Sequence, residues 1–377
     1  MHITLSIAPL LLCFFIFCQK NNIVDVTDEN TLEKVIESEF KRLQMPGVGY
    51  AAVKDDSIIF IGARGYANRK SKIKFTSQTR MMIASISKTM AVTALMQLHE
   101  KELLSLDDDI NDYLPFRVRN PRFPDEPITV EMLLTHTSSI SDDGVNTSML
   151  LFGYVDYPES LMDGERNYLT EDGRDCTDNN FSSHQPGKQY EYTNVGTALI
   201  ACLVEHVSGT DYNLYCKEHI FTPLGMTKTT WFFSETPKEE VAIPYTDNTI
   251  ADPSNPYMTT TAWPSDQLIT TVEDLSRFLR AYILGGTFNG YQLLKSETVD
   301  LVVRSYLINT RDEQQGLIFH TKEIDDRLLW GHGGDTYGIS TTMYFDKEHR
   351  AGFIVFVNRT YGHSEIINNA LFLYALQ

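Results

Sequence analysis

A single lysine stands among apolar residues in the segment 81–98, MMIASISKTMAVTALMQL. Burying the Lys88 ammonium without partners would be costly, and burial lowers the pKa of a lysine from its usual value of about 10.4. Ser85 lies three residues earlier, on the same face of a helix. A neutral amine at this distance could take the hydroxyl proton and activate a serine nucleophile. The alternative is a lysine whose charged end reaches solvent from a buried helix.

The pattern Ser-x-x-Lys is weak alone, because a chain of this composition is expected to contain about one chance match. A second match, Ser71 to Lys74, lies in the polar stretch SKIK, which is typical of a solvated strand. We therefore interpret Ser71 and Lys74 as solvent-exposed residues without a catalytic role. The first match falls in a helix predicted from about Met82 to Lys101, which would place Ser85 in the favourable field of the helix amino terminus.

Two further segments carry polar residues beside predicted elements. Tyr192 and Asn194 form Tyr-x-Asn just before the helical pattern NVGTALIACLVEHVSG, and His332-Gly333-Gly334 lies between two strand-like segments. Each has an ordinary structural interpretation. A tyrosine is usually a packed aromatic with a satisfied hydroxyl, an asparagine here is usually a helix cap, and a strand histidine is usually satisfied locally.

In this order, Ser-x-x-Lys, Tyr-x-Asn and His-x-Gly resemble the serine hydrolases related to class C β-lactamases. That family also includes DD-carboxypeptidases, D-amino-acid peptidases and carboxylesterases. The segments LLTHTSSI, HIFTPLGM, TTVEDLSRFL and WGHGG are similar to its accessory signatures. The resemblance extends from about residue 30 to 375, and the joint occurrence of three motifs outweighs the separate structural interpretations.

The resemblance implies a role for each matching residue. Ser85 would be the acylated nucleophile, and Lys88 would assist its deprotonation. Tyr192 would share the general acid and base work, relaying a proton to the leaving group; a tyrosinate would need a nearby cation, for which Lys88 is the candidate. Asn194 would hold the substrate amide or orient Lys88.

The resemblance also implies a substrate-binding strand edge. The oxyanion hole would come from the backbone N–H of Ser85 and of a residue just after His332, for which we expect Asp335. Gly333 and Gly334 suit this edge, because the lack of a Cβ lets a substrate approach the backbone.

The expected substrate class follows from one position at which this chain departs from the β-lactamase members of the family. β-Lactamase members of the family carry a lysine where this chain has His332, and that fixed charge helps to hold the carboxylate of a β-lactam. Imidazole is mostly neutral above its pKa of about 6.5. We therefore expect an enzyme for small esters or amides, with a D-amino-acid peptidase, DD-carboxypeptidase or β-lactamase as alternatives. A catalytically inactive binding or scaffold protein of the same fold is the non-enzyme alternative.

The net charge and the absence of certain motifs limit the kinds of binding partner and cofactor that we expect. The net charge of −18 argues against nucleic acid or an anionic membrane surface. HEKEL at His99 lacks the second histidine of a zinc motif, so neither a metal nor a cofactor is expected. No G-x-S-x-G elbow is present, which argues against an α/β-hydrolase. The expected partner is a small-molecule ester, amide or peptide.

Strand-like segments at both ends with helices between them predict an α/β (α+β) fold. We expect a β-lactamase/transpeptidase-like domain over residues 25–377, with an antiparallel sheet flanked by helices. Its α/β lobe would cover about 28–80 and 290–377, and an inserted, mainly helical lobe about 81–289. Residues 140–190 are acidic and lack a sustained period, which predicts a long surface excursion. We expect it to roof the pocket, with acids such as Asp142 and Asp143 solvated or favouring neutral or cationic substrates.

The amino-terminal residues 1–20 are expected to be a signal segment. The apolar run Ile3–Phe17 is short for a hydrocarbon core of about 30 Å. This predicts a secreted or periplasmic (extracytoplasmic) protein, with lipidation of Cys18 as an alternative and as the only expected membrane contact. Of the remaining cysteines, Cys202 and Cys216 are interpreted as small core residues, and no disulfide pairing is predicted.

Overall fold

The computed structural model describes residues 26–246 and 257–377. The expected signal segment 1–20, including Cys18, lies outside the described residues. No helix in the described part of the chain is both long enough and apolar enough to cross a membrane.

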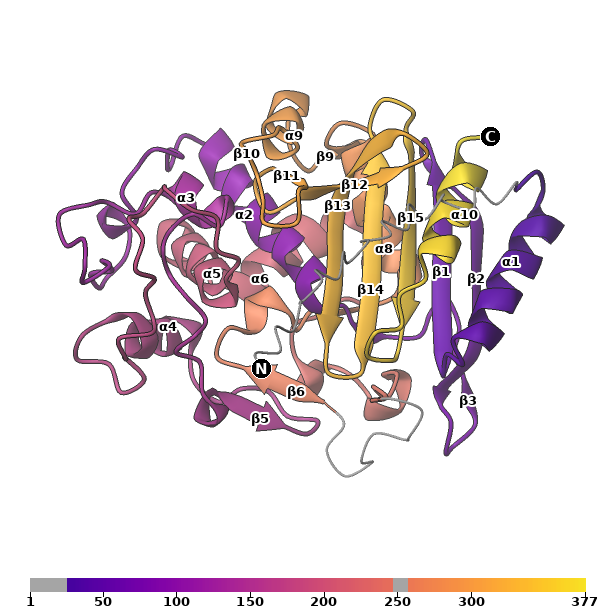
Figure 1. Ribbon diagram of the computed structural model, residues 1–377, viewed down its shortest axis with the longest axis horizontal. Helices are drawn as coiled ribbons and strands as arrows, with labels where there is room; N and C mark the ends of the chain where they lie inside the picture. Colours follow the sequence, from indigo (N-terminus) through magenta and orange to yellow (C-terminus); the bar gives the residue numbers. More distant parts are fainter. Residues whose placement is uncertain (1–25, 247–256) are drawn as a thin grey trace, which may run out of the picture.

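The central element is an antiparallel sheet with strand order β10-β11-β12-β13-β14-β15-β1-β2-β3 (Figure 1). The strands β1 and β2 form an antiparallel hairpin around the Asp55-Asp56 turn. The carboxyl-terminal strand β15 lies between β14 and β1, and thus joins strands from the two ends of the chain. The bounds are β1 Gly47–Lys54, β2 Ser57–Asn68, β3 Ile73–Lys74, β10 Leu307–Ile308, β11 Gln314–Gln315, β12 His320–Ile324, β13 Arg327–Thr336, β14 Ile339–Asp346 and β15 Ala351–Val357.

Helices cover both faces of this sheet. Alternate side chains of a strand point to opposite faces, so Tyr50 and Ala52 join the core under α1 and α10, whereas Ala51 and Val53 join the core that includes α8. The helices beside the sheet in Figure 1 surround α2 and α5, which pack on one another. The bounds are α1 Glu29–Arg42, α2 Lys88–Glu100, α3 Val130–Leu134, α4 Leu161–Leu169, α5 Asn194–Ser208, α6 Tyr212–Cys216, α7 Thr222–Leu224, α8 Val272–Ile283, α9 Ser296–Val302 and α10 Glu365–Ala375.

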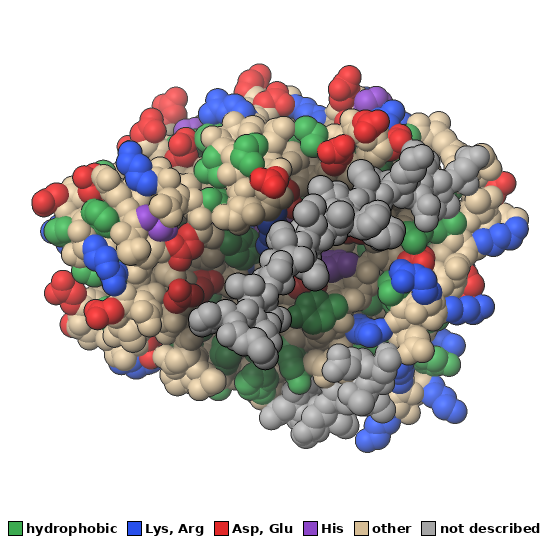
Figure 2. All heavy atoms as spheres, viewed as in Figure 1, with side chains coloured by type: hydrophobic (Ala, Val, Ile, Leu, Met, Phe, Trp, Pro, Cys, Tyr) green, Lys and Arg blue, Asp and Glu red, His purple; other side chains and the backbone are tan. Residues whose placement is uncertain are grey.

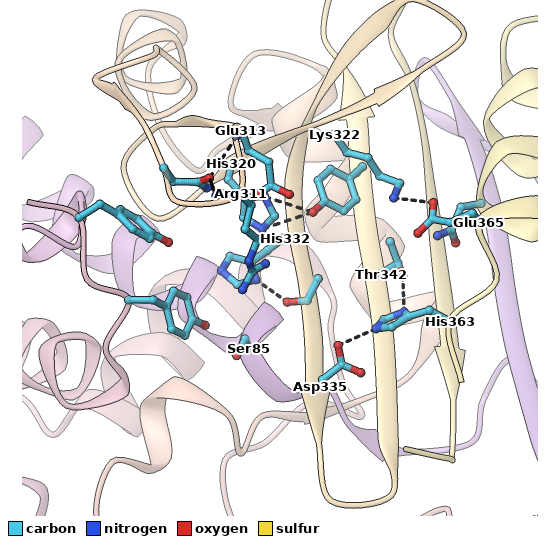
Figure 3. Close-up of a pocket in the computed structure, with 16 residues that line it drawn as sticks. Ser85, Arg311, Glu313, His320, Lys322, His332, Asp335, Thr342, His363 and Glu365 are labelled. Carbon is cyan, nitrogen blue, oxygen red and sulfur yellow. Dashed lines mark hydrogen bonds and ion pairs between the residues drawn. The ribbon is translucent and has the colours of Figure 1, made fainter. Parts of the chain in front are cut away.

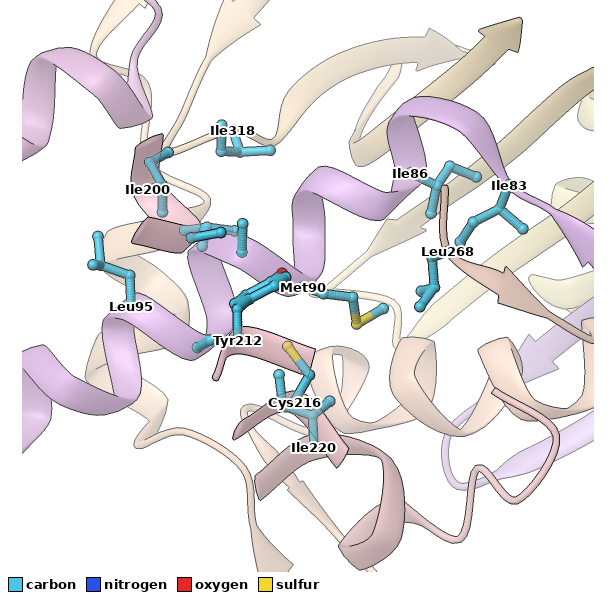
Figure 4. Close-up of a cluster of buried hydrophobic side chains, with 14 of the residues drawn as sticks. Ile83, Ile86, Met90, Leu95, Ile200, Tyr212, Cys216, Ile220, Leu268 and Ile318 are labelled. Carbon is cyan, nitrogen blue, oxygen red and sulfur yellow. The ribbon is translucent and has the colours of Figure 1, made fainter. Parts of the chain in front are cut away.

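Threonine and glycine residues mark several helix ends. Thr129 and Thr271 cap α3 and α8, and Gly209 ends α5 at a positive φ of 68°. The cluster in Figure 4 buries Cys216 beside Tyr212 and Ile220. Cys202 is also buried, so both cysteines are core residues, as predicted, and both thiols are free. Short elements complete the described chain: β4 Met81–Met82, β5 Leu150–Phe152, β6 Met258–Thr260, β7 Ile269–Thr270, β8 Thr287–Phe288, β9 Tyr291–Gln292, and the single-turn helices 84–87, 110–112, 147–149, 217–221, 233–235, 238–240 and 263–265.

The segment 140–190 is mostly irregular, as predicted, but it contains two regular elements. Ser160 caps α4 by accepting a hydrogen bond from Asp163 N. The strand β5 pairs with β6, which lies more than 100 residues later in the chain, so a period within 140–190 alone could not reveal it.

Candidate active site

Ser85 lies in a short 3₁₀ helix, Ala84–Ser87, that precedes α2. The prediction that an α-helix begins near Met82 is wrong, because Met81 and Met82 pair with β7 and α2 begins at Lys88. Ala84 has a φ of 48°, a strained conformation for a residue with a Cβ, and it turns the chain from the strand into the helix. Residues three apart share a face in a 3₁₀ helix, so Ser85 still faces Lys88.

Lys88 is completely buried, with 0% of its surface exposed. Its Nζ donates hydrogen bonds to Ser85 Oγ at 3.1 Å, to Asn194 Oδ1 at 2.7 Å and to the backbone carbonyl of Ser265 at 2.9 Å. The alternative of a lysine that reaches solvent is therefore wrong. Burial lowers the pKa of Lys88 to about 8, against the opposing charges of Asp266 and Asp142. A substantial fraction of the amine is thus neutral at mildly alkaline pH.

The neutral form of Lys88 fits the geometry of a general base. Its lone pair can accept the proton of the Ser85 hydroxyl while two N–H groups remain on Asn194 and Ser265. The same three oxygen atoms thus hold the amine in place in either protonation state, with Ser85 Oγ as acceptor from the ammonium and as donor to the neutral amine.

Tyr192 lies against the same pair, with its ring centroid 4.9 Å from Lys88 Nζ and a side-chain hydrogen bond to Ser85. Burial raises the pKa of Tyr192, so its phenol is neutral at ordinary pH rather than a tyrosinate. A neutral phenol can donate or relay a proton. His136, from the LLTHTSSI segment, packs on Tyr192 with ring centroids 4.6 Å apart and accepts a hydrogen bond from Thr193 N at 3.4 Å.

Asn194 is the first residue of α5, and the cap of that helix is Thr193, whose Oγ1 accepts from Gly196 N. The interpretation of Asn194 as a helix cap is therefore wrong. Its Oδ1 accepts from Lys88, which agrees with the expected alternative that Asn194 orients the lysine.

The segment His332-Gly333-Gly334-Asp335 lies on β13, directly against the turn that carries Ser85. Burial lowers the pKa of His332 well below its usual value, so the imidazole is neutral, as the substrate argument assumed. The carboxylate of Asp335 accepts from Ser340 Oγ at 2.9 Å and contacts His363 Nε2 at 2.7 Å. The side chain of Asp335 is thus occupied, and the role expected for this residue uses only its backbone.

Gly334 allows β13 to approach the nucleophile turn. A Cβ at this position would lie 2.4 Å from Thr341 Oγ1 and 2.5 Å from the carbonyl oxygen of Ile83, two atoms that are hydrogen-bonded to each other. Real Cβ atoms do not come this close to neighbouring atoms, so the strand or the turn would have to move.

We expect Gly334→Ala to lower the melting temperature and the rate of Ser85 acylation, because it separates β13 from the turn 83–85. Gly333→Ala is the matched control, because the nearest atom to its Cβ would be the carbonyl oxygen of Thr341 at 3.8 Å, an ordinary van der Waals contact. Thermal denaturation of the two variants tests this, and equal melting temperatures would contradict it.

A cavity of about 330 Å³ opens in front of Ser85 (Figure 3). Of the segment 140–190, which was expected to roof the pocket, Tyr190 at its very end lines the cavity, and no other residue that the structure describes in this segment does. Several charged residues that sequence reasoning missed converge on the cavity from separate strands and loops, where no motif marks them: Arg311, Glu313, His320, Lys322, His363 and Glu365.

Most of these ionisable side chains pair with another ionisable side chain. Lys322 Nζ contacts Glu365 Oε2 at 2.5 Å, and His320 Nδ1 contacts Glu313 Oε2 at 3.1 Å. Arg311 differs, because its guanidinium has no ion-pair partner among the side chains of residues 26–246 and 257–377. Acidic side chains are scattered widely over the face shown in Figure 2, in keeping with the net charge.

Comparison with known proteins agrees with this geometry. Residues 32–376 match the family described as Beta-lactamase. The protein flp of Staphylococcus aureus strain N315 is 25% identical over 253 residues, which are 67% of this chain and 48% of flp, so the match spans about half of that relative. The octameric penicillin-binding protein homologue from Pyrococcus abyssi superposes with a TM-score of 0.70 and 23% identity, covering 93% of this chain and 76% of the other. A D-amino acid amidase from Ochrobactrum anthropi SV3 gives 0.72 and 21%, covering 92% and 98%.

The chain belongs to the β-lactamase family of serine hydrolases, since the family match covers nearly all of the described residues. The solved structures show that it has the β-lactamase/transpeptidase-like fold, as predicted from the motifs and the order of the elements.

Proposed function

We propose that this protein hydrolyses small esters or amides through an acyl-enzyme formed on Ser85. One observation supports this most strongly: Lys88 Nζ is fully buried, has a lowered pKa and lies 3.1 Å from Ser85 Oγ. Ser85 also lines the open cavity, so a substrate carbonyl can reach the hydroxyl that contacts this amine.

Acylation would begin when neutral Lys88 takes the proton of Ser85 and the Oγ attacks the substrate carbonyl. The resulting oxyanion would be held by the backbone N–H groups of Ser85 and Asp335, at about 3–4 kcal/mol of barrier for each preorganised donor. Tyr192 would pass a proton to the departing alcohol or amine, whose bond to the carbonyl carbon then breaks. In deacylation the same groups would take a proton from water, which attacks the ester and releases the acid and free Ser85.

The neutral His332 favours substrates that do not require a cation at this position. Esters and amides without a carboxylate beside the reacting carbonyl meet this condition. The fold is shared with a D-amino acid amidase, so amide hydrolysis is among the reactions that this architecture supports.

Purified protein assayed with p-nitrophenyl acetate and butyrate, D-amino-acid amides, D-alanyl peptides and nitrocefin tests the proposal. We expect ester or amide turnover and covalent labelling by a fluorophosphonate probe, with the adduct mapped to the peptide that contains Ser85. Absence of both hydrolysis and labelling would contradict it and would favour the binding or scaffold alternative.

Carboxypeptidase activity is a second candidate, favoured by Arg311. An unpaired guanidinium beside the cavity can bind a carboxylate through two parallel hydrogen bonds. It would supply from the loop before β11 the positive charge that His332 lacks.

If Arg311 binds a substrate carboxylate, Arg311→Gln should raise KM for a D-alanyl-D-alanine peptide by about 10- to 100-fold, since a hydrogen bond to a charged group contributes about 1.5–3 kcal/mol. The carboxamide of the same peptide should be unaffected. Arg304→Gln is the control, because Arg304 is exposed and packs on Tyr306 outside the cavity lining. Equal effects on peptide and carboxamide would exclude the second candidate.

A further inference from the structure

Asp142 lies in the acidic segment that the sequence suggested was solvated, yet its carboxylate is bound to the start of α5. It accepts hydrogen bonds from Thr193 Oγ1 at 2.6 Å, Asn194 N at 2.7 Å, Asn194 Nδ2 at 2.9 Å and Val195 N at 3.1 Å. Four donors on one carboxylate are close to the number that its two oxygens can accept.

This arrangement fixes which way the Asn194 amide points. Lys88 Nζ can only donate to Asn194 while it is protonated, and an ionised carboxylate can only accept. Both contacts are satisfied only when Oδ1 faces Lys88 at 2.7 Å and Nδ2 faces Asp142 at 2.9 Å. A flipped amide would set N–H against N–H on one side and oxygen against oxygen on the other.

We propose that Asp142 is a positioning residue of the catalytic centre, which holds the Asn194 amide so that its oxygen keeps Lys88 at Ser85. The inference rests on the proposed function, because it assigns to Asp142 a part in the same Ser85 chemistry. Asp142 does not contact Ser85 in this arrangement; it acts through Asn194.

Helix capping alone does not account for these contacts. Thr193 already caps α5 through its own Oγ1, which accepts from Gly196 N at 3.2 Å. A cap needs only backbone N–H groups, whereas the contact between Asp142 and Asn194 Nδ2 orients a side chain toward the interior. Burial and the charge of Asp142 raise the pKa of the neighbouring acid Glu165 well above its usual range, so the negative charge at this end of α5 is that of Asp142.

The charge of Asp142 also acts on Lys88 through space. The titratable groups that interact with Lys88 come from several segments packed around it: Asp142, Asp266, Tyr192, His136 and His332. Of these, Asp142 and Asp266 raise the pKa of Lys88 against the effect of burial. Removing the Asp142 charge should therefore lower the pKa of Lys88 and move the acid limb of the pH–rate profile to lower pH.

The test compares Asp142→Asn with Asp143→Asn in the full chain, using the ester that the wild type hydrolyses best. Asp143 is the adjacent acid, is exposed, and makes no side-chain contact with α5 within the described residues, so its variant makes the same change of charge outside the network. For Asp142→Asn we expect a 10- to 100-fold lower kcat at the pH plateau, little change in KM and an acid limb at lower pH. Asp143→Asn should match the wild type in all three.

A double-mutant cycle separates positioning from general destabilisation. If Asp142 acts through Asn194, the pair Asp142→Asn and Asn194→Ala should cost no more kcat than Asn194→Ala alone, because coupled residues are not additive. If Asp142→Asn does not fold, Asp142→Ser takes its place. Thr193 still caps α5 in this variant, whereas serine is too short to hold the Asn194 amide, so the same loss of kcat is expected.

The outcomes are distinct. A wild type that neither hydrolyses substrate nor reacts with the fluorophosphonate probe overturns the proposed function, and the inference with it. An active wild type with additive losses in the cycle, or with Asp142→Asn and Asp142→Ser equal to Asp143→Asn in kcat and pH profile, overturns this inference alone.

Discussion

Replacing Ser85 with alanine is expected to reduce ester or amide hydrolysis by at least about 10⁴-fold, because removal of a nucleophile typically leaves only the contribution of binding and of the oxyanion hole. The same variant should lose covalent labelling by the fluorophosphonate probe. Its melting temperature should stay near that of the wild type, since the change removes one hydroxyl at the edge of a cavity.

The matched control is Ser71→Ala, which alters the other Ser-x-x-Lys pair of the chain. Ser71 lies in the turn between β2 and β3, Lys74 lies on β3, and both are exposed. This variant should therefore keep full activity and full labelling. Retained turnover in Ser85→Ala, measured by initial rates with freshly purified protein, would exclude the acyl-enzyme assignment.

Lys88→Met is expected to lower kcat by about 10³-fold or more, within the range by which general-base catalysis contributes. Methionine fills a similar volume but cannot accept a proton, and it leaves Asn194 Oδ1 and the Ser265 carbonyl without their donor. Lys74→Met on the exposed strand β3 is the matched control, and its kcat should equal that of the wild type.

The wild-type pH profile provides a separate check on Lys88. Its pKa of about 8 means that the amine is protonated, and cannot act as a base, at lower pH. The value of kcat/KM should therefore rise about tenfold per pH unit below about pH 8 and level off above it. This limb should disappear in Lys88→Met. A wild-type rate that is flat between pH 6 and pH 9 would show that Lys88 does not limit the reaction as a base.

The burial of Lys88 beside Ser85 was predictable because its signal is local. An isolated lysine three residues from a serine, in an otherwise apolar stretch, indicates both burial and a lowered pKa, and the structure has both for Lys88. The antiparallel sheet flanked by helices was predictable from the strand-like segments at both ends of the chain and the helical segments between them. The position of Tyr192 and of His332 beside Ser85 followed only from the resemblance to a known family, since no local pattern links segments more than 100 residues apart.

Other features could not be predicted, because they depend on tertiary pairing. The α-helix begins at Lys88 rather than Met82 because Met81 and Met82 pair with a strand almost 190 residues later. Asp142 was interpreted as a solvated acid, since nothing near it in the sequence shows that four donors of α5 surround it. Arg311 lines the cavity from a short turn whose sequence has no distinguishing pattern.

Because β15 lies between β14 and β1, the sheet can be completed only after residues 351–357 have been translated. A nascent chain that ends before Ala351 already contains Ser85, Lys88 and Tyr192, but it lacks the strand that bridges β14 and β1. Until those residues have been translated, β14 and β1 lack the strand that pairs with both of them, and the sheet is interrupted at its centre. A chain that terminates before Ala351 should therefore be inactive rather than partly active, whichever substrate the full-length hydrolase takes.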